Sequence, residues 1–183
     1  MILARAFIET PLGSMLALDS GAGLCALEFT GPEERLTRLD ARLARWFPPH
    51  EMVDRDTPTI ARTREWLDAY FAGASADDMS SSGLTLDLRG APFEKRVWTA
   101  LRTIAPGETT SYGAIANALG SAGASRAVGA ANGANPVAII VPCHRVIGAS
   151  GALTGYGGGL DKKTWLLSHE RRWRDEPQPS LFR

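Results

Sequence analysis

The sequence has few cysteines, no long apolar run and no net charge, and each shortage excludes a class of protein. Two cysteines among 183 residues cannot form a disulfide framework, so we expect a reducing, cytoplasmic location. No apolar run reaches the ~18 residues that span a bilayer, and residues 1–15 lack the features of a signal peptide, so we expect no membrane partner. The 44% of hydrophobic residues is enough for a globular core and argues against disorder.

The zero net charge conceals two halves of opposite sign. Residues 1–89 contain 9 Lys and Arg against 14 Asp and Glu, a net charge of −5. Residues 90–183 contain 11 against 6, a net charge of +5. A basic half is what a polyanion such as DNA would meet, although two halves of opposite charge could also simply attract each other.

The first half of the chain has the pattern of a small α/β domain over residues 1–89. Short apolar runs separated by turn signals predict strands at residues 2–8, 14–19 and 24–29. Helical spacing predicts a helix that opens at Pro32 and a second that begins at Thr57-Pro58 and ends at Gly73. A small, polar loop at 72–83 and a last strand at 84–88 complete this half.

The second half reads as mostly helical, over residues 90–175, before a loose tail at 176–183. Helices are predicted at residues 92–104, from the cap at Thr110 or Ser111 to Leu119, at 126–134 with Ser125 as its cap, and at 160–172. The two short central helices suggest a helix-turn-helix. Between them and the last helix lie a buried apolar segment at 136–141 and a glycine-rich stretch at 148–159.

Cys143 is the residue most suited to chemistry. Cys25 reads as a small buried apolar residue, whereas Cys143 is followed by His144 and Arg145, which can both favour a thiolate. A thiol nucleophile also needs a base and an acceptor that orients it; His144 is the nearest base, and Glu170 in the last helix offers the acceptor. Adjacent residues on a strand would point apart, so contact between Cys143 and His144 stays open. No cysteine or histidine spacing is that of a metal site, so we expect no metal.

The helix at 126–134 consists mostly of glycine and alanine, and the simplest interpretation is that it packs closely against another helix. A helix this small could also enter a groove of DNA, with Arg126 reaching a phosphate or a gap in the base stack. Tyr112 carries a phenol that can donate a hydrogen bond or can simply be packed.

Several segments together resemble the O6-alkylguanine-DNA alkyltransferases, in particular the bacterial constitutive members. The active-site motif of that family is matched by ProCysHisArgVal at 142–146. Five further segments match in order and spacing, and the resemblance is strong over residues 91–171: SerTyrGlyAlaIleAla (111–116), ArgAlaValGlyAlaAla (126–131), AsnProVal (135–137), GlyTyrGlyGlyGly (155–159) and TrpLeuLeuSerHisGlu (165–170).

The resemblance implies an α+β fold with a ribonuclease-H-like N-terminal α/β domain and a mostly helical, winged helix-turn-helix C-terminal domain. It implies that Cys143 accepts the alkyl group, with His144 as a water-linked base and Glu170 as the carboxylate that orients it. Asn135 would brace the cysteine segment, and Tyr112 would protonate the damaged base and help to rotate it out of the duplex.

The resemblance also implies which residues contact DNA and which line the pocket. Arg126 would occupy the place of the rotated base, with Ala127, Gly129, Ala130 and Tyr112 against the minor groove. The pocket would be lined by Tyr156, Gly157 and Val146. The zinc site of some family members is not reproduced, because Cys25 lacks matching ligands.

The expected function is therefore a single, irreversible transfer of an alkyl group from O6-alkylguanine, and from O4-alkylthymine, in double-stranded DNA, without a cofactor. We expect a monomer, and cooperative binding along DNA stays open. Two other functions are compatible with the residues. One is a non-catalytic DNA module that senses damage, and the other is a Cys-His-Glu hydrolase that acts on acyl groups with multiple turnovers.

Overall fold

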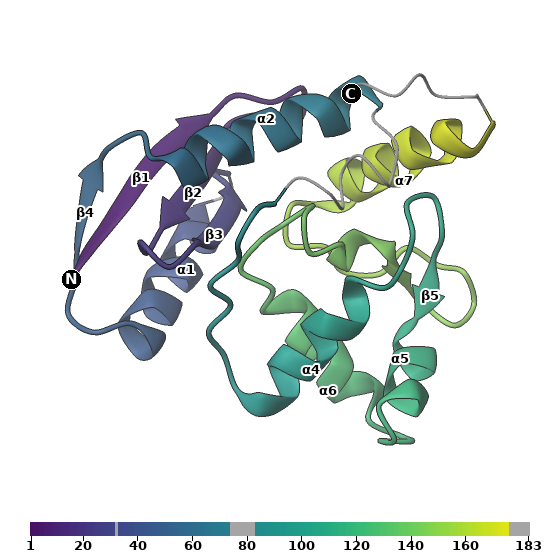
Figure 1. The fold of residues 1–183 in the computed structure, drawn as a ribbon. Helices are drawn as coiled ribbons and strands as arrows, with labels where there is room; N and C mark the ends of the chain where they lie inside the picture. The colour runs from purple at the N-terminus through teal and green to yellow at the C-terminus, as the bar shows by residue number, and fades with distance from the viewer. Residues whose placement is uncertain (32, 74–82, 176–183) are drawn as a thin grey trace. The chain divides into compact units, whose positions relative to one another are not determined.

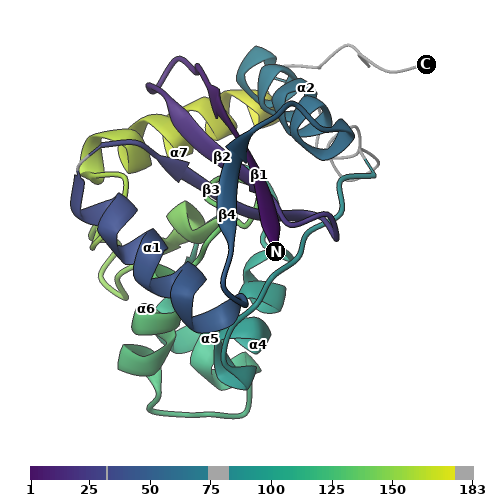
Figure 2. The same ribbon diagram turned by 90° about the vertical axis from the view of Figure 1, so that its left-hand side faces the viewer.

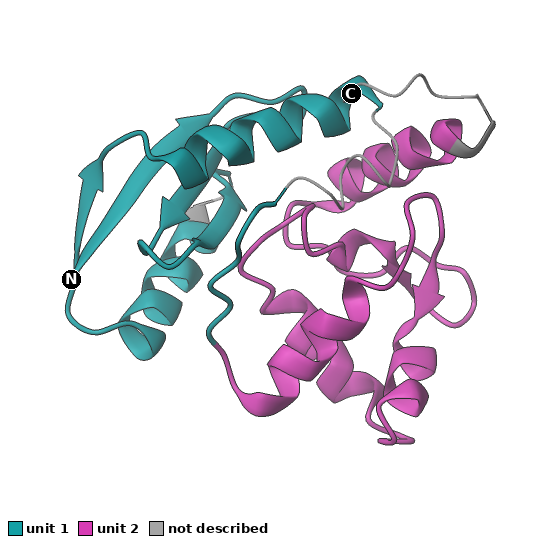
Figure 3. Ribbon diagram, in the orientation of Figure 1, with its two compact units in different colours: residues 1–89, 178–183 teal, residues 90–177 magenta. Residues whose placement is uncertain are grey.

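A computed structural model describes residues 1–31, 33–73 and 83–175 (Figure 1). The chain divides into two compact units, and the boundary falls between residues 89 and 90 (Figure 3). Three sequence predictions lie partly or wholly outside the described residues: Pro32, most of the loop at 72–83, and the tail at 176–183. Helices and strands together make a mixed α/β protein.

The first unit is built on a four-stranded sheet with the order β3-β2-β1-β4, whose strands lie side by side in Figure 2. The strands β1 (Ile2–Ile8), β2 (Met15–Asp19) and β3 (Leu24–Phe29) are antiparallel and confirm three predicted strands. The strand β4 (Glu51–Asp54) pairs with β1 in parallel and was not predicted. Four residues with two apolar side chains give too weak a pattern to be recognised.

Two helices cover this sheet. The helix α1 (Glu33–Trp46) packs Leu39 and Leu43 against a core cluster that includes Leu3, Leu18 and Cys25. The helix α2 (Pro58–Ala72) contacts β1, β2 and β3. Its ends are those the sequence predicts, because the hydroxyl of Thr57 accepts a hydrogen bond from Ile60 N at 3.2 Å and Gly73 adopts a left-handed φ of 86°.

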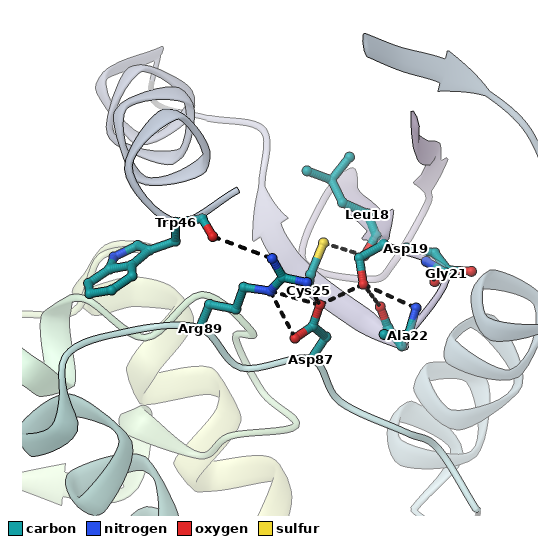
Figure 4. Close-up of polar contacts among 10 residues, drawn as sticks. Leu18, Asp19, Gly21, Ala22, Cys25, Trp46, Asp87 and Arg89 are labelled. Carbon is teal, nitrogen blue, oxygen red and sulfur yellow. Dashed lines mark hydrogen bonds and ion pairs between the residues drawn. The ribbon is translucent and has the colours of Figure 1, made fainter. Parts of the chain in front are cut away.

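The strand predicted at 84–88 is wrong. It is reduced to a single bridge between Leu86 and Leu24. The guanidinium of Arg89, which follows this segment, lies 4.2 Å from the centre of the Phe47 ring and donates to the Trp46 carbonyl at 3.5 Å. Figure 4 shows Arg89 between the Trp46 carbonyl and the carboxylate of Asp87.

The same region encloses the first cysteine. Cys25 is buried, and its thiol lies 3.3 Å from the carbonyl of Leu18 (Figure 4). Burial, reinforced by the charges of Asp87 and Asp19, raises the pKa of Cys25 to about 12. Its thiol is therefore protonated at neutral pH, as expected of a residue that only packs.

The second unit is mostly helical. It contains α4 (Pro92–Leu101), α5 (Tyr112–Ala118), α6 (Ser125–Gly133) and α7 (Leu160–Asp175). A parallel pair of two-residue strands joins β5 (Thr110–Ser111) to β6 (Val146–Ile147), and neither was predicted. The helices α4, α5 and α6 pack together (Figure 1). The indole of Trp98, in α4, donates to the Ala131 carbonyl of α6 at 2.9 Å.

Three predicted helix ends need correction. The helix α4 ends at Leu101 rather than at residue 104. Beyond Leu101 the chain forms turns, and the Thr103 hydroxyl donates a hydrogen bond to the Ala100 carbonyl at 2.8 Å. Ser125 lies inside α6 and caps nothing, because Ala124 is already part of a turn that leads into the helix. The helix α7 continues to Asp175, past the predicted end at residue 172.

Candidate active site

Cys143 lies at the start of a single turn of 3-10 helix, η1 (Cys143–Arg145), which directly precedes β6. The cysteine is buried, with 7% of its surface exposed. The extended backbone considered for residues 143 and 144 is not what the structure contains. Because the backbone turns here, with Arg145 N bonded to Pro142 O at 3.0 Å, both His144 and Arg145 can reach one carboxylate.

That carboxylate belongs to Glu170 of α7. Its Oε1 lies 2.7 Å from Nε2 of His144. Arg145 donates two hydrogen bonds to the same carboxylate, at 2.9 Å from Nε to Oε2 and 2.8 Å from Nη2 to Oε1. The Gly107 amide donates to Oε2 at 3.1 Å. His144 and Glu170 are completely buried. The arrangement therefore holds one imidazole rigidly between the cysteine segment and α7.

The electrostatics fix the protonation of this group. Burial lowers the pKa of His144, and the attraction of Glu170 offsets this only in part, so the ring is neutral at pH 7. Burial acts to raise the pKa of Glu170, but hydrogen bonds from His144 and Arg145 and the positive charge of Arg145 outweigh it and hold that pKa well below its usual range. Glu170 is an ionised acceptor, so the proton of the neutral ring sits on Nε2.

The other ring nitrogen is then a base with a free lone pair. Among the described residues, Nδ1 of His144 is buried and has no hydrogen-bond partner. A buried nitrogen of this kind has the chemistry to take a proton from a neighbouring thiol or from a water next to it.

Asn135 ties together the segment that precedes Cys143. Its amide nitrogen donates to the carbonyls of Val141 at 2.8 Å and Val137 at 3.3 Å, and its oxygen accepts from Val137 N at 3.0 Å. The segment it encloses contains Ile139, which has a left-handed φ of 69° that β-branched residues rarely adopt. Asn135 is thus placed to maintain a bent backbone just before the cysteine.

The predicted pocket residues, Tyr156, Gly157 and Val146, lie in the glycine-rich stretch and in β6. The Tyr156 ring lies 6.4 Å from the His144 ring in an edge-on arrangement, and Val146 of β6 is fully buried. Tyr112 begins α5 after the capping hydroxyl of Ser111, and its phenol accepts a hydrogen bond from Thr154 Oγ1 at 3.5 Å. Gly157 is exposed in the glycine-rich stretch.

Apart from Tyr112 of α5, the predicted DNA-binding residues lie along α6. Arg126, Ala127 and Ala130 are exposed, so one side of this helix offers almost no side-chain bulk. Gly129 is half-buried, and a Cβ there would lie 3.8 Å from the Tyr112 ring, an ordinary contact.

Comparison with known proteins places the chain. Residues 92–172 match the family model described as "6-O-methylguanine DNA methyltransferase, DNA binding domain". The methylated-DNA–protein-cysteine methyltransferase of Mycolicibacterium paratuberculosis is 51% identical over 155 residues, covering 85% of this chain and 90% of that protein. The protein of that name from Salmonella typhimurium is 43% identical over 166 residues, with 89% and 92% covered. This chain belongs to the methylated-DNA–protein-cysteine methyltransferase family.

Solved structures of the family agree. Mycobacterium tuberculosis OGT in complex with DNA is 41% identical, with a TM-score of 0.74 and 94% of each chain covered. The M. tuberculosis O6-methylguanine methyltransferase gives a TM-score of 0.75 at 41% identity, over 97% of this chain and 96% of the other. The expected membership of the alkyltransferase family is confirmed.

One site residue of this family member was not predicted from the sequence. Lys163 of α7 is fully buried, and its ammonium group donates to the carbonyls of Val146 at 2.6 Å and Thr154 at 2.7 Å. Burial lowers the pKa of Lys163, while attraction to a negative charge on Cys143 raises it. The signal was its helical spacing, since residues 163, 166, 167 and 170 share one buried side of α7.

Arg145 is indicated by the sequence as a neighbour of the cysteine, but not as a second hydrogen-bond partner of Glu170.

Among the described residues of this methyltransferase family member, no group of three or more His, Cys, Asp or Glu could hold a metal. The helices within 1–31, 33–73 and 83–175 include none long and apolar enough to cross a membrane.

Proposed function

We propose that this chain repairs double-stranded DNA by moving an alkyl group from O6 of guanine to Sγ of Cys143, once per molecule. The observation that carries the proposal is the neutral His144 directly after Cys143, with Nε2 committed to Glu170 and Nδ1 unpaired among the described residues. The names of the relatives support the same reaction, since each is called a methylated-DNA–protein-cysteine methyltransferase.

The residues have complementary roles in this reaction. His144 removes the thiol proton at Nδ1, through a bound water as in the family. Sulfur then bonds to the alkyl carbon while the bond from that carbon to O6 breaks. Guanine leaves with the electron pair, and a proton from the phenol of Tyr112 offsets its negative charge. The proton held by His144 is then released to solvent and the Tyr112 phenolate regains one from solvent, so that in balance a proton passes from the thiol to guanine and the alkyl group passes to sulfur.

The product explains why the protein acts only once. A thioether, unlike a thioester, has no carbonyl for water to attack, so the thiol is not regenerated. Lys163 assists the forward step, because its buried ammonium attracts the thiolate. Tyr156, Gly157 and Val146 form the walls against which the damaged base would rest.

The DNA-binding surface is assigned to α6. An exposed side composed of Ala127 and Ala130 lets the helix backbone approach a groove closely, and Arg126 at its first turn can enter the gap that a rotated base leaves. Rotation costs ~ a few kcal/mol, which phosphate contacts of the basic half would offset. In this interpretation α5 and α6 are a helix-turn-helix within a winged C-terminal domain.

The domain assignments follow the two units. We assign residues 1–89 to a ribonuclease-H-like domain and 90–175 to the DNA-binding and alkyl-acceptor domain, and O4-alkylthymine is a second substrate. The cytoplasm, where thiols stay reduced, suits two free cysteines.

The test is incubation of the full chain with duplex DNA that carries O6-methylguanine labelled in the methyl group. We expect one label per chain, on Cys143. Cys143→Ala should take no label and still bind the duplex. Binding without transfer by the unaltered chain would instead identify a damage-sensing module, and repeated turnover on an ester would identify a hydrolase.

A further inference from the structure

Asn132 connects α6 directly to the residue that carries the nucleophile. It lies in the last turn of the helix and is 4% exposed. Its amide nitrogen donates to the backbone carbonyl of Cys143 at 3.3 Å. The opposite side of the same helix carries the exposed residues Arg126, Ala127 and Ala130. One short helix therefore offers a surface to DNA and, on its inner side, bonds to the cysteine.

This hydrogen bond is not needed to satisfy the carbonyl. The Cys143 carbonyl already accepts a hydrogen bond from the Val146 amide, at the end of η1. Removing the Asn132 amide would thus leave no orphaned acceptor on the cysteine.

The side chain is also a poor choice for stability. Its oxygen Oδ1 is buried and has no hydrogen-bond partner among the described residues. Burying an unpaired polar atom is unfavourable, and an apolar side chain of similar size is often neutral or better in such a place. Packing alone would favour leucine at position 132.

Asn135, three residues later, is the informative contrast. Both polar ends of its amide are used, and its oxygen is the partner of the buried Val137 amide. Its loss would leave a buried backbone donor unpaired, which destabilises a fold. Asn135 therefore has a structural reason to be polar that Asn132 lacks.

We propose that Asn132 is a positioning residue, which fixes the backbone of Cys143 relative to α6 so that the sulfur is aligned with a base presented by DNA bound to that helix. The inference rests on the proposed function. A sulfur held through the helix that binds the duplex keeps its line of attack even when the helix shifts slightly on binding.

The experiment compares Asn132→Leu and Asn132→Ala with the unaltered chain. Both variants lack the donor, but leucine fills the space and alanine leaves a cavity. We expect the rate constant for alkylation to fall about fivefold in both variants with duplex O6-methylguanine, since a hydrogen bond of ordinary net strength corresponds to that factor, and to stay within about twofold with free O6-benzylguanine, which α6 does not hold. The melting temperature should be maintained in the leucine variant and fall only in the alanine variant.

A measurement of affinity for undamaged duplex completes the test. Affinity should stay within about twofold of the unaltered chain in both variants, because the exposed side of α6 is untouched. Reaction with the duplex at the normal rate in the leucine variant, or an equal loss with free O6-benzylguanine, overturns the inference. So does a rate that falls only together with the melting temperature, as in a core variant such as Val97→Ala. Failure of the unaltered chain to react with either substrate would overturn the proposed function itself.

Discussion

Replacing Glu170 by glutamine should reveal how much the buried ion pair contributes. The substitution keeps the size of the side chain and removes its charge. Arg145, with 8% of its side chain exposed, would then hold a positive charge opposite a neutral amide. Removing one partner of a buried pair costs about 3–5 kcal/mol, against a total free energy of unfolding of about 5–15 kcal/mol for an ordinary domain.

Urea unfolding at pH 7 measures this loss, with the rate of reaction with O6-benzylguanine recorded on the same samples. Glu170→Gln should unfold at a much lower urea concentration. The double variant Glu170→Gln/Arg145→Leu should recover part of the loss, because it leaves no unpaired charge. A loss below about 1 kcal/mol in the single variant would refute the reasoning, since Arg145 would then find compensation elsewhere.

Three other predictions concern pH, charge and DNA. The folded pKa of His144 is lowered below the ordinary 6.5, so the free energy of unfolding should hold steady above pH 6.5 and decline below it, whereas the alkylation rate follows the folded pKa and should decline only at a lower pH, as urea midpoints and rates measured from pH 7.5 downward will reveal. Lys163→Met should move the pH of half-maximal alkylation upward, because the thiolate loses a nearby cation; Lys162→Met is the control, and an equal shift in both would argue against it. Arg126→Ala should slow reaction with duplex O6-methylguanine at least tenfold more than reaction with free O6-benzylguanine, a difference of about 1.4 kcal/mol in activation free energy. Equal losses with both substrates would show that Arg126 does not fill the gap in the base stack.

Local signals predicted those parts of the fold that depend on local chemistry. The helix α2 was predicted with its true ends because Thr57, Pro58 and Gly73 are themselves the cap, the first turn and the left-handed stop. The strand β4 and the pair β5–β6 are two to four residues long and exist only because a distant strand lies beside them. No periodicity within such short segments could indicate them.

The candidate site shows the same division. Proximity in sequence indicates His144 next to Cys143, and Glu170 is indicated both as an acceptor in the last helix and by the motif resemblance; the structure brings it to 2.7 Å from that ring. The buried ammonium of Lys163 looks, in the sequence, like one of two solvated lysines at the start of a helix. Its two hydrogen bonds are to backbone carbonyls, so the spacing of Lys163 with the buried residues of α7 indicates its burial but no side-chain pattern reveals its partners.

The buried thiol in the N-terminal sheet has a practical consequence for work on this molecule. Because burial raises the pKa of Cys25 to about 12, its thiol stays protonated near neutral pH, and we expect it not to react with electrophiles. Mass spectrometry of the intact chain would then count adducts on Cys143 alone. Every molecule thereby contains its own unreactive reference thiol, and no Cys25 replacement is needed before the stoichiometry of repair is measured.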